Sequence, residues 1–123
     1  MKLPQKVTIG DITVRDGFQH EEKFIPTEAK LWLAEQLLLA GFKHIEVTNL
    51  GNPKGMPQFN DADNLMKQLR NSKTVSHLLK EVSLTCITIR EKAIERAIQN
   101  RKEGFGPDRI PAYKLHRICG LCS

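Results

Sequence analysis

The sequence predicts an α/β fold built on a parallel sheet, and two observations carry this prediction. Segments with strand character alternate with segments of helical period, which is typical of βα units joined by right-handed crossovers. In addition, residues 82–89, "VSLTCITI", contain no charge. A strand of this kind suits a parallel sheet, because its strands are buried on both faces.

The first βα unit is predicted from residues 6–40. Residues 6–14, "KVTIGDITV", are rich in β-branched side chains and indicate a strand. Residues 27–40 have a helical period, with Thr27 expected as the N-cap and Gly41 as the stop. The apolar stripe expected to face inward is formed by Leu31, Ala34, Leu37 and Leu38.

Two more units follow. Residues 43–50, "KHIEVTNL", predict a second strand, and the Gly/Pro-rich residues 51–58 predict a loop. A helix is expected from about Asp61, with a shorter helical piece at 75–81. After the third strand, residues 90–104 predict a helix that has Ala93, Ile94, Ala97 and Ile98 inward and Gly104 at its end.

The periodic pattern stops after Gly104. We therefore expect residues 1–110 to form one domain and residues 111–123 to be an irregular tail foreign to it, with a disordered terminus as the alternative. The C-x-x-C formed by Cys119 and Cys122 lacks a second pair and a redox-type βαβ context, so we interpret it as incidental.

Composition limits the function classes. The 123 residues carry a net charge of +5, with no apolar run long enough for a membrane span and no signal-peptide core at the N-terminus. The charge is too dispersed for nucleic-acid binding. Three cysteines without a secretory signal predict free thiols in the cytoplasm.

Three ionisable residues are candidates for chemistry. Arg15 and Asp16 follow the first predicted strand, and ligands of parallel α/β folds bind at the carboxyl ends of strands. Glu46 lies inside the second strand, where alternation places His44, Glu46 and Thr48 on one face. The structural alternatives are a strand-end salt bridge for the Arg–Asp pair, and an edge position or a buried ion pair for Glu46.

Three motifs resemble the hydroxymethylglutaryl-CoA lyase branch of the pyruvate carboxyltransferase-like (DRE-TIM metallolyase) family. The first is "RDGFQ" (15–19), the second "IEVT" (45–48), and the third "PKGMPQ" (53–58). Their combination over residues 6–110 is more specific than any one motif.

The resemblance implies a (β/α)8 TIM barrel, of which this chain would supply the first three βα units. It also implies a divalent cation, Mg²⁺ or Mn²⁺, and carbon–carbon bond cleavage in an acyl-CoA or keto acid. Carried over by position, Asp16 would bind the metal, Arg15 and Glu46 would be catalytic, and Gln19 and Thr48 would contact substrate.

Two readings remain open beside the lyase. Thr13-Val14 replaces the Gly-Pro usual in the lyases and resembles the acyl-CoA-condensing synthases and carboxyltransferases of the same superfamily. The family's His-x-His and asparagine would lie on later strands and its cysteine on a later loop, so we expect the chain alone to be inactive. We also expect it to associate with itself as a homo-oligomer. A non-catalytic binding or assembly module is the third reading.

Overall fold

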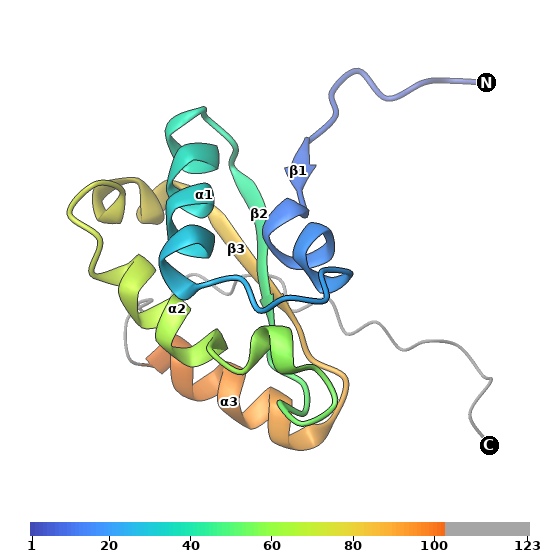
Figure 1. The fold of residues 1–123 in the computed structure, drawn as a ribbon. Coiled ribbons are helices and arrows are strands. Elements are labelled where there is room, and N and C mark those ends of the chain that lie inside the picture. Colours follow the sequence, from blue (N-terminus) through green and yellow to red (C-terminus); the bar gives the residue numbers. More distant parts are fainter. Residues whose placement is uncertain (103–123) are drawn as a thin grey trace.

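A computed structural model describes residues 1–102 (Figure 1). In chain order the strands are β1 (Gly10–Asp11), β2 (His44–Asn49) and β3 (Ser83–Ile87). The helices are α1 (Thr27–Leu39), α2 (Ala62–Arg70) and α3 (Glu91–Lys102). Three short turns complete the order: the π-helical η1 (Thr13–Gly17) and the 3-10 turns η2 (Pro57–Phe59) and η3 (Ser76–Glu81). The predicted tail at 111–123 and the predicted helix stop at Gly104 lie outside the described residues.

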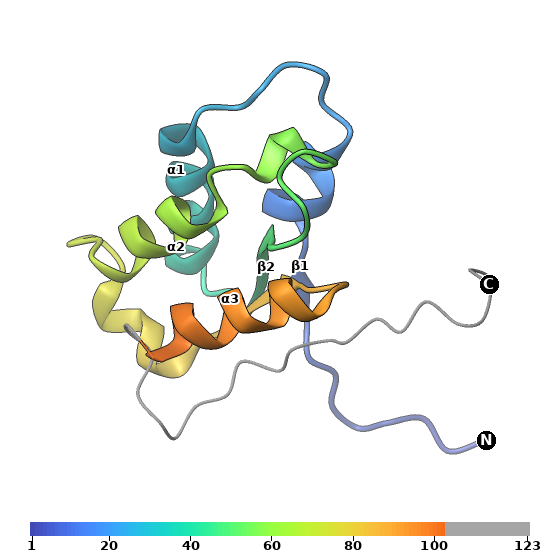
Figure 2. The same ribbon diagram turned by 90° about the horizontal axis from the view of Figure 1, so that it is seen from below.

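The strands form one parallel sheet, as the sequence predicted, and their order in it is β1-β2-β3. Figure 2 shows α1, α2 and α3 following one another in an arc around the strands. This is the layering of three consecutive units of a βα barrel.

The main core lies between β2 and the first two helices. Its buried members are aliphatic side chains from η1, α1, β2, α2 and β3, together with Val75: Val14, Ala34, Leu38, Ile45, Val47, Leu65, Met66, Leu69, Val75 and Leu84. A second, smaller cluster joins β3 to α3 through Leu50, Ala62, Cys86, Ala93 and Ala97. Ala34 and Leu38 of α1 and Ala93 and Ala97 of α3 are buried in these clusters, as the sequence predicted. Ile98, expected inward, is 43 % exposed.

The strand predicted at 6–14 is wrong for most of its length. Only Gly10 and Asp11 pair with β2, opposite His44 and Ile45. Residues 6–9 extend beyond the start of β2 and have no partner in the described sheet. After Asp11 the chain leaves the sheet, because the Asp11 carboxylate accepts hydrogen bonds from the Thr13 backbone N–H at 2.8 Å and from the Thr13 hydroxyl at 3.0 Å. Such local bonds compete with a β ladder.

Helix α1 confirms its predicted range but not its predicted cap. Pro26 occupies the N-cap position, and the Thr27 hydroxyl donates to Asp61 Oδ2 at 2.8 Å instead. At the other end Gly41 has a φ of 97°, the left-handed conformation that ends a helix and favours glycine.

The strict alternation predicted along β2 is interrupted. The pairing of β2 with β3 shifts register between Glu46 and Thr48, so that Glu46 pairs with Thr85 and Thr48 with Cys86. This is a bulge at Val47, and a bulge changes which face the following side chains occupy. Glu46 and Thr48 are therefore not equivalent positions of one face.

A buried lysine joins α1 to α2. Lys30 is 1 % exposed and its ammonium contacts both carboxylate oxygens of Asp61, at 2.8 and 3.0 Å. The same ammonium lies 4.3 Å from the ring centroid of Phe24. Burying a cation and a carboxylate costs several kcal/mol of desolvation per ion, and the attraction between the paired charges offsets that cost only while both partners are present.

Among the residues that the structure describes, no helix is long and apolar enough to cross a membrane.

Replacing Lys30 by Met should destabilise the chain by about 3–5 kcal/mol, because the Asp61 carboxylate is left buried without its counter-charge. Urea denaturation followed by circular dichroism measures this loss. Adding Asp61→Asn to Lys30→Met should recover much of it, and Lys67→Met, at an exposed position of α2, should change little. Equal effects of the two lysine substitutions would contradict the ion pair.

Candidate active site

The short turn η1 places the "RDG" motif above the sheet. Its Val14 is completely buried in the main core, against β2 and α1. The Asp16 backbone N–H bonds the Ile12 carbonyl at 2.7 Å and the Arg15 N–H bonds it at 3.2 Å. With Val14 fixed in the core, the neighbouring Arg15 is directed toward β2. Single-turn π segments are frequent at functional sites.

Arg15 is the centre of a polar cluster that unites four of the five predicted site residues. Its Nη1 contacts Asp16 Oδ1 at 2.7 Å and Gln19 Oε1 at 3.2 Å, and its Nε makes a short ion pair with Glu46 Oε1. The side chains of Arg15 and Glu46 are 13 % and 11 % exposed, whereas that of Asp16 is 44 % exposed. The guanidinium thus joins a buried carboxylate in the sheet to an accessible one at the rim.

The arrangement combines both structural alternatives considered for these residues. Arg15 and Asp16 form a salt bridge, and Glu46 forms a partly buried pair. Because these pairs share one guanidinium beside the carboxyl end of β1, the structural contacts also orient Arg15. A planar cation held in this way presents fixed N–H donors to an oxyanion.

The fit to a divalent cation is partial. Asp16 is accessible and supplies hard carboxylate oxygens of the kind that Mg²⁺ prefers. Yet the described residues contain no group of three His, Cys, Asp or Glu side chains that could hold a metal ion. Asp16 can therefore contribute one ligand, and the others would have to come from outside residues 1–102.

Thr48 is not part of the Arg15 cluster. Its side chain is completely buried, and its hydroxyl has no hydrogen-bond partner among the described residues. The bulge at Val47 separates its position from that of Glu46. A contact with substrate, as the motif suggested, would require a path to this hydroxyl.

Glu46 also influences a buried thiol. Burial raises the pKa of Cys86 from an ordinary 9.0 to about 12, with a further raising effect from the Glu46 carboxylate and an opposing one from Arg96. Cys86 belongs to the smaller core cluster and is 8 % exposed. Its thiol is consequently protonated and unreactive at neutral pH.

Sequence reasoning gave no function to Gln58 or Lys30, although both are central to the loops beside the site. Gln58 is 7 % exposed and bonds three backbone groups of residues 21–25. One signal was available for Lys30, because it lies on the same helical stripe as Ala34 and Leu38, a position where a lysine must be paired.

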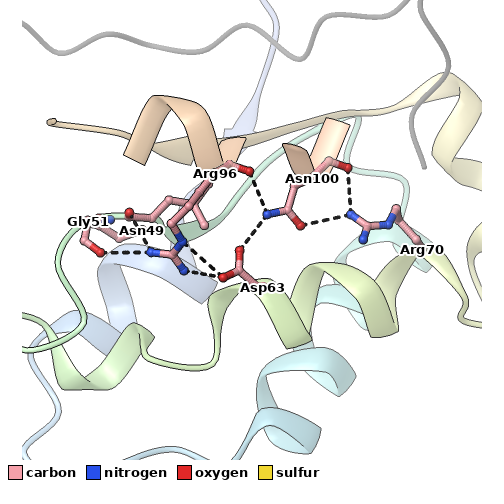
Figure 3. A network of polar contacts seen from close by, with 7 residues as sticks. Asn49, Gly51, Asp63, Arg70, Arg96 and Asn100 are labelled. Carbon is pink, nitrogen blue, oxygen red and sulfur yellow. Dashed lines mark hydrogen bonds and ion pairs between the residues drawn. The ribbon is translucent and has the colours of Figure 1, made fainter. Parts of the chain in front are cut away.

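A second polar network fixes the start of the loop after β2 (Figure 3). Arg96 of α3 donates to the carbonyls of Leu50 and Gly51, at 3.0 and 3.3 Å, and pairs with Asp63 of α2 at 2.6 Å. Asn100 bonds the other oxygen of Asp63 at 2.7 Å. The loop that carries the "PKGMPQ" motif is therefore anchored to two helices.

Known proteins that resemble this chain in sequence include hydroxymethylglutaryl-CoA lyases. No family model matches the chain. It is 38 % identical over 77 residues to hydroxymethylglutaryl-CoA lyase YngG of Bacillus subtilis, an alignment that covers 63 % of this chain and 26 % of that protein. It is also 37 % identical over 68 residues to the mitochondrial hydroxymethylglutaryl-CoA lyase of Rattus norvegicus, covering 55 % and 21 % of the two chains.

The crystal structure of the B. subtilis lyase superimposes with a TM-score of 0.68 at 31 % identity, over 81 % of this chain and 31 % of that one. The chain is hydroxymethylglutaryl-CoA lyase-like. It spans about a quarter of the length of the curated relatives it matches (26 % and 21 %). The resemblance inferred from the three motifs is thus confirmed, as is the partial TIM barrel. This lyase-like segment contains the Arg15 cluster.

Cys86 should resist alkylation by iodoacetamide at pH 8 in the folded chain and react once urea unfolds it. The raised pKa also means that the folded state holds the thiol proton more tightly than the unfolded state. The contribution of this thiol to the free energy of unfolding is therefore fully present below about pH 9, and it is lost as the pH rises from 9 toward 12. A Cys119→Ser/Cys122→Ser background isolates this thiol for mass spectrometry. Rapid alkylation of the folded chain at pH 8 would contradict the burial of Cys86.

Proposed function

We propose that this lyase-like chain contributes the Arg15–Asp16–Gln19–Glu46 cluster to the active site of a divalent-metal-dependent carbon–carbon lyase that acts on hydroxymethylglutaryl-CoA or a closely related acyl-CoA. The observation that carries the proposal is the contact of one guanidinium with two carboxylates and an amide. The similarity to lyases from a bacterium and a mammal supports the same reaction class.

Arg15 is the proposed electrophilic group. Cleavage of a carbon–carbon bond next to a carbonyl leaves negative charge on an enolate oxygen, and a fixed guanidinium stabilises that charge most where water is excluded. Glu46, nearly buried in β2, neutralises Arg15 and keeps its plane oriented. In this proposal Glu46 acts through Arg15 rather than by taking a proton.

Asp16 is the proposed metal ligand. A bound divalent cation would polarise the carbonyl oxygens of the substrate as a Lewis acid. Asp16 would hold it from the η1 turn, next to the Arg15 guanidinium. Gln19 would line the pocket from the following loop, and Thr48 is kept as a proposed substrate contact on its motif position alone.

The two alternatives have weaker support. The relatives above are lyases, so the Thr13-Val14 resemblance to condensing synthases stands without a second observation. A purely binding or assembly module would not need a guanidinium shared between Asp16 and Glu46. The lyase proposal therefore explains more of the described contacts.

A chimera tests the proposal directly. Residues 1–102 replace the matching segment of the B. subtilis lyase, and hydroxymethylglutaryl-CoA cleavage is followed by chromatography of the acyl-CoA product. We expect the chimera to cleave the substrate, and Arg15→Gln to lower kcat about 100-fold or more through loss of oxyanion stabilisation. The 123-residue chain alone should show no turnover.

Two controls sharpen this test. Arg90→Gln removes an exposed arginine just before α3 and should leave kcat unchanged. Metal content of the Arg15→Gln chimera should equal that of its parent. Unchanged turnover in Arg15→Gln would remove Arg15 from the chemistry, and an inactive parent chimera would overturn the proposed function.

Metal binding by Asp16 is tested separately. Mn²⁺ titrated into the chimera and followed by electron paramagnetic resonance should bind at least about tenfold more weakly to Asp16→Asn, because one anionic oxygen ligand is lost. Asp63→Asn, at an exposed carboxylate paired with Arg96, should bind Mn²⁺ like the parent. Equal affinities of the parent and Asp16→Asn would exclude Asp16 as a ligand.

A further inference from the structure

The loop between η1 and α1 is held by one buried side chain. Gln58 of η2 accepts a hydrogen bond from the Ile25 N–H at 2.8 Å, and its amide nitrogen donates to the carbonyls of Glu21 and Lys23 at 3.1 and 3.0 Å. Ile25 and the carbonyl-bearing residues belong to the loop 18–26, in which residues 20–26 contain no helix or strand. These backbone groups have no β-ladder partner, and they form their hydrogen bonds with the Gln58 side chain instead.

The backbone of Gln58 is also held by a hydrogen bond. Its backbone carbonyl accepts a short hydrogen bond from the buried Lys30 ammonium. Lys30 in turn pairs with Asp61, which follows η2 and also accepts from Thr27. The position of Gln58 is therefore fixed by the polar contacts that join α1 to the start of α2.

The loop held by Gln58 is also a wall of the candidate site. Gln19, at its start, bonds Arg15. A pocket of about 280 Å³ lies between this loop and the segment that follows β2, and Gln19, Phe24, Met56 and Gln58 are among its lining residues. Figure 2 shows the two segments at the same end of the structure.

We propose that Gln58 is a positioning residue for the lyase site: it sets the loop 18–26, and through it the place of Gln19 beside Arg15 and the shape of the pocket. This inference rests on the proposed function for its catalytic meaning. Its structural part, the order of the loop, is independent of that function.

The chemistry of the amide makes the proposal testable without a change of size. The amide of Gln58 offers one acceptor and two donors to three backbone groups of matching polarity. A carboxylate of the same shape has no donor, so two of its contacts become repulsions with carbonyl oxygens. The nearby Glu21 and Glu22, which also line the pocket, add further negative charge.

The first experiment measures amide hydrogen exchange in the full 123-residue chain. In Gln58→Glu, the backbone amides of residues 18–26 should exchange about tenfold faster or more, because the loop opens more often. The matched control is Gln68→Glu on α2, where the amide makes a single 3.3 Å bond to Asn64, and it should not change exchange in the loop. Gln58→Met, which lacks the three hydrogen bonds of the Gln58 amide, should deprotect the loop in the same way.

The second experiment uses the chimera. Gln58→Glu should raise KM about fivefold or more and change kcat by less than about twofold, since Arg15 retains Asp16 and Glu46 while the pocket wall moves. A loss of stability alone would lower the active fraction and therefore kcat, with KM unchanged. Gln68→Glu should leave both constants at the parental values.

Two results would count against the proposal, and a third would count against the proposed function alone. Unchanged exchange of residues 18–26 in both Gln58 variants would show that Gln58 does not hold the loop. A deprotected loop with an unchanged KM would show that the loop does not shape the site. An inactive parent chimera would instead overturn the proposed function, and the exchange experiment would still decide whether Gln58 orders the loop.

Discussion

The ion pair between Arg15 and Glu46 is the interaction on which the arrangement of the site depends. Glu46 lies within the central strand of a parallel sheet, where a carboxylate without a counter-charge is strongly unfavourable. The counter-charge comes from η1, whose Val14 is buried beside the strand. The turn after Asp11, which the Asp11 carboxylate stabilises through Thr13, brings Arg15 into contact with Glu46. A structural need thus orients the group proposed for catalysis.

Two polar anchors outside this pair organise the loops at the carboxyl end of the sheet. Arg96 fixes the beginning of the loop after β2 through the carbonyls of Leu50 and Gly51. Gln58, supported by Lys30, fixes its end and at the same time holds the loop before α1. Both anchors use buried or partly buried side chains on backbone groups. Loops that lack secondary structure thereby obtain hydrogen bonds that a ladder would otherwise supply.

The partial barrel explains several features that are unusual for a complete domain. Ile9, Ile12 and Ile89 are about half exposed or more, at 70 %, 49 % and 55 %, and flank the strands where a closed barrel would place neighbours. Among the described residues, Asp16 is not joined by two other His, Cys, Asp or Glu side chains that could hold a metal ion with it. In the proposed site, the described residues supply the Arg15 guanidinium and the Asp16 carboxylate.

The sequence by itself determined the order of the βα units, the ranges of α1 and β2, the helix stop at Gly41, and the identity of the Arg15, Asp16, Gln19 and Glu46 cluster. These follow from periodicity and from motifs that are local in the chain. Only the tertiary structure decided the loss of the strand at 6–9, the bulge at Val47, the burial of Thr48 and the part played by Lys30 and Gln58. Each of these depends on a partner distant in sequence, namely β2, β3, Asp61 or the loop 18–26. A pattern read along one segment contains no information about the groups that it will meet in space, and burial next to those groups fixes the outcome.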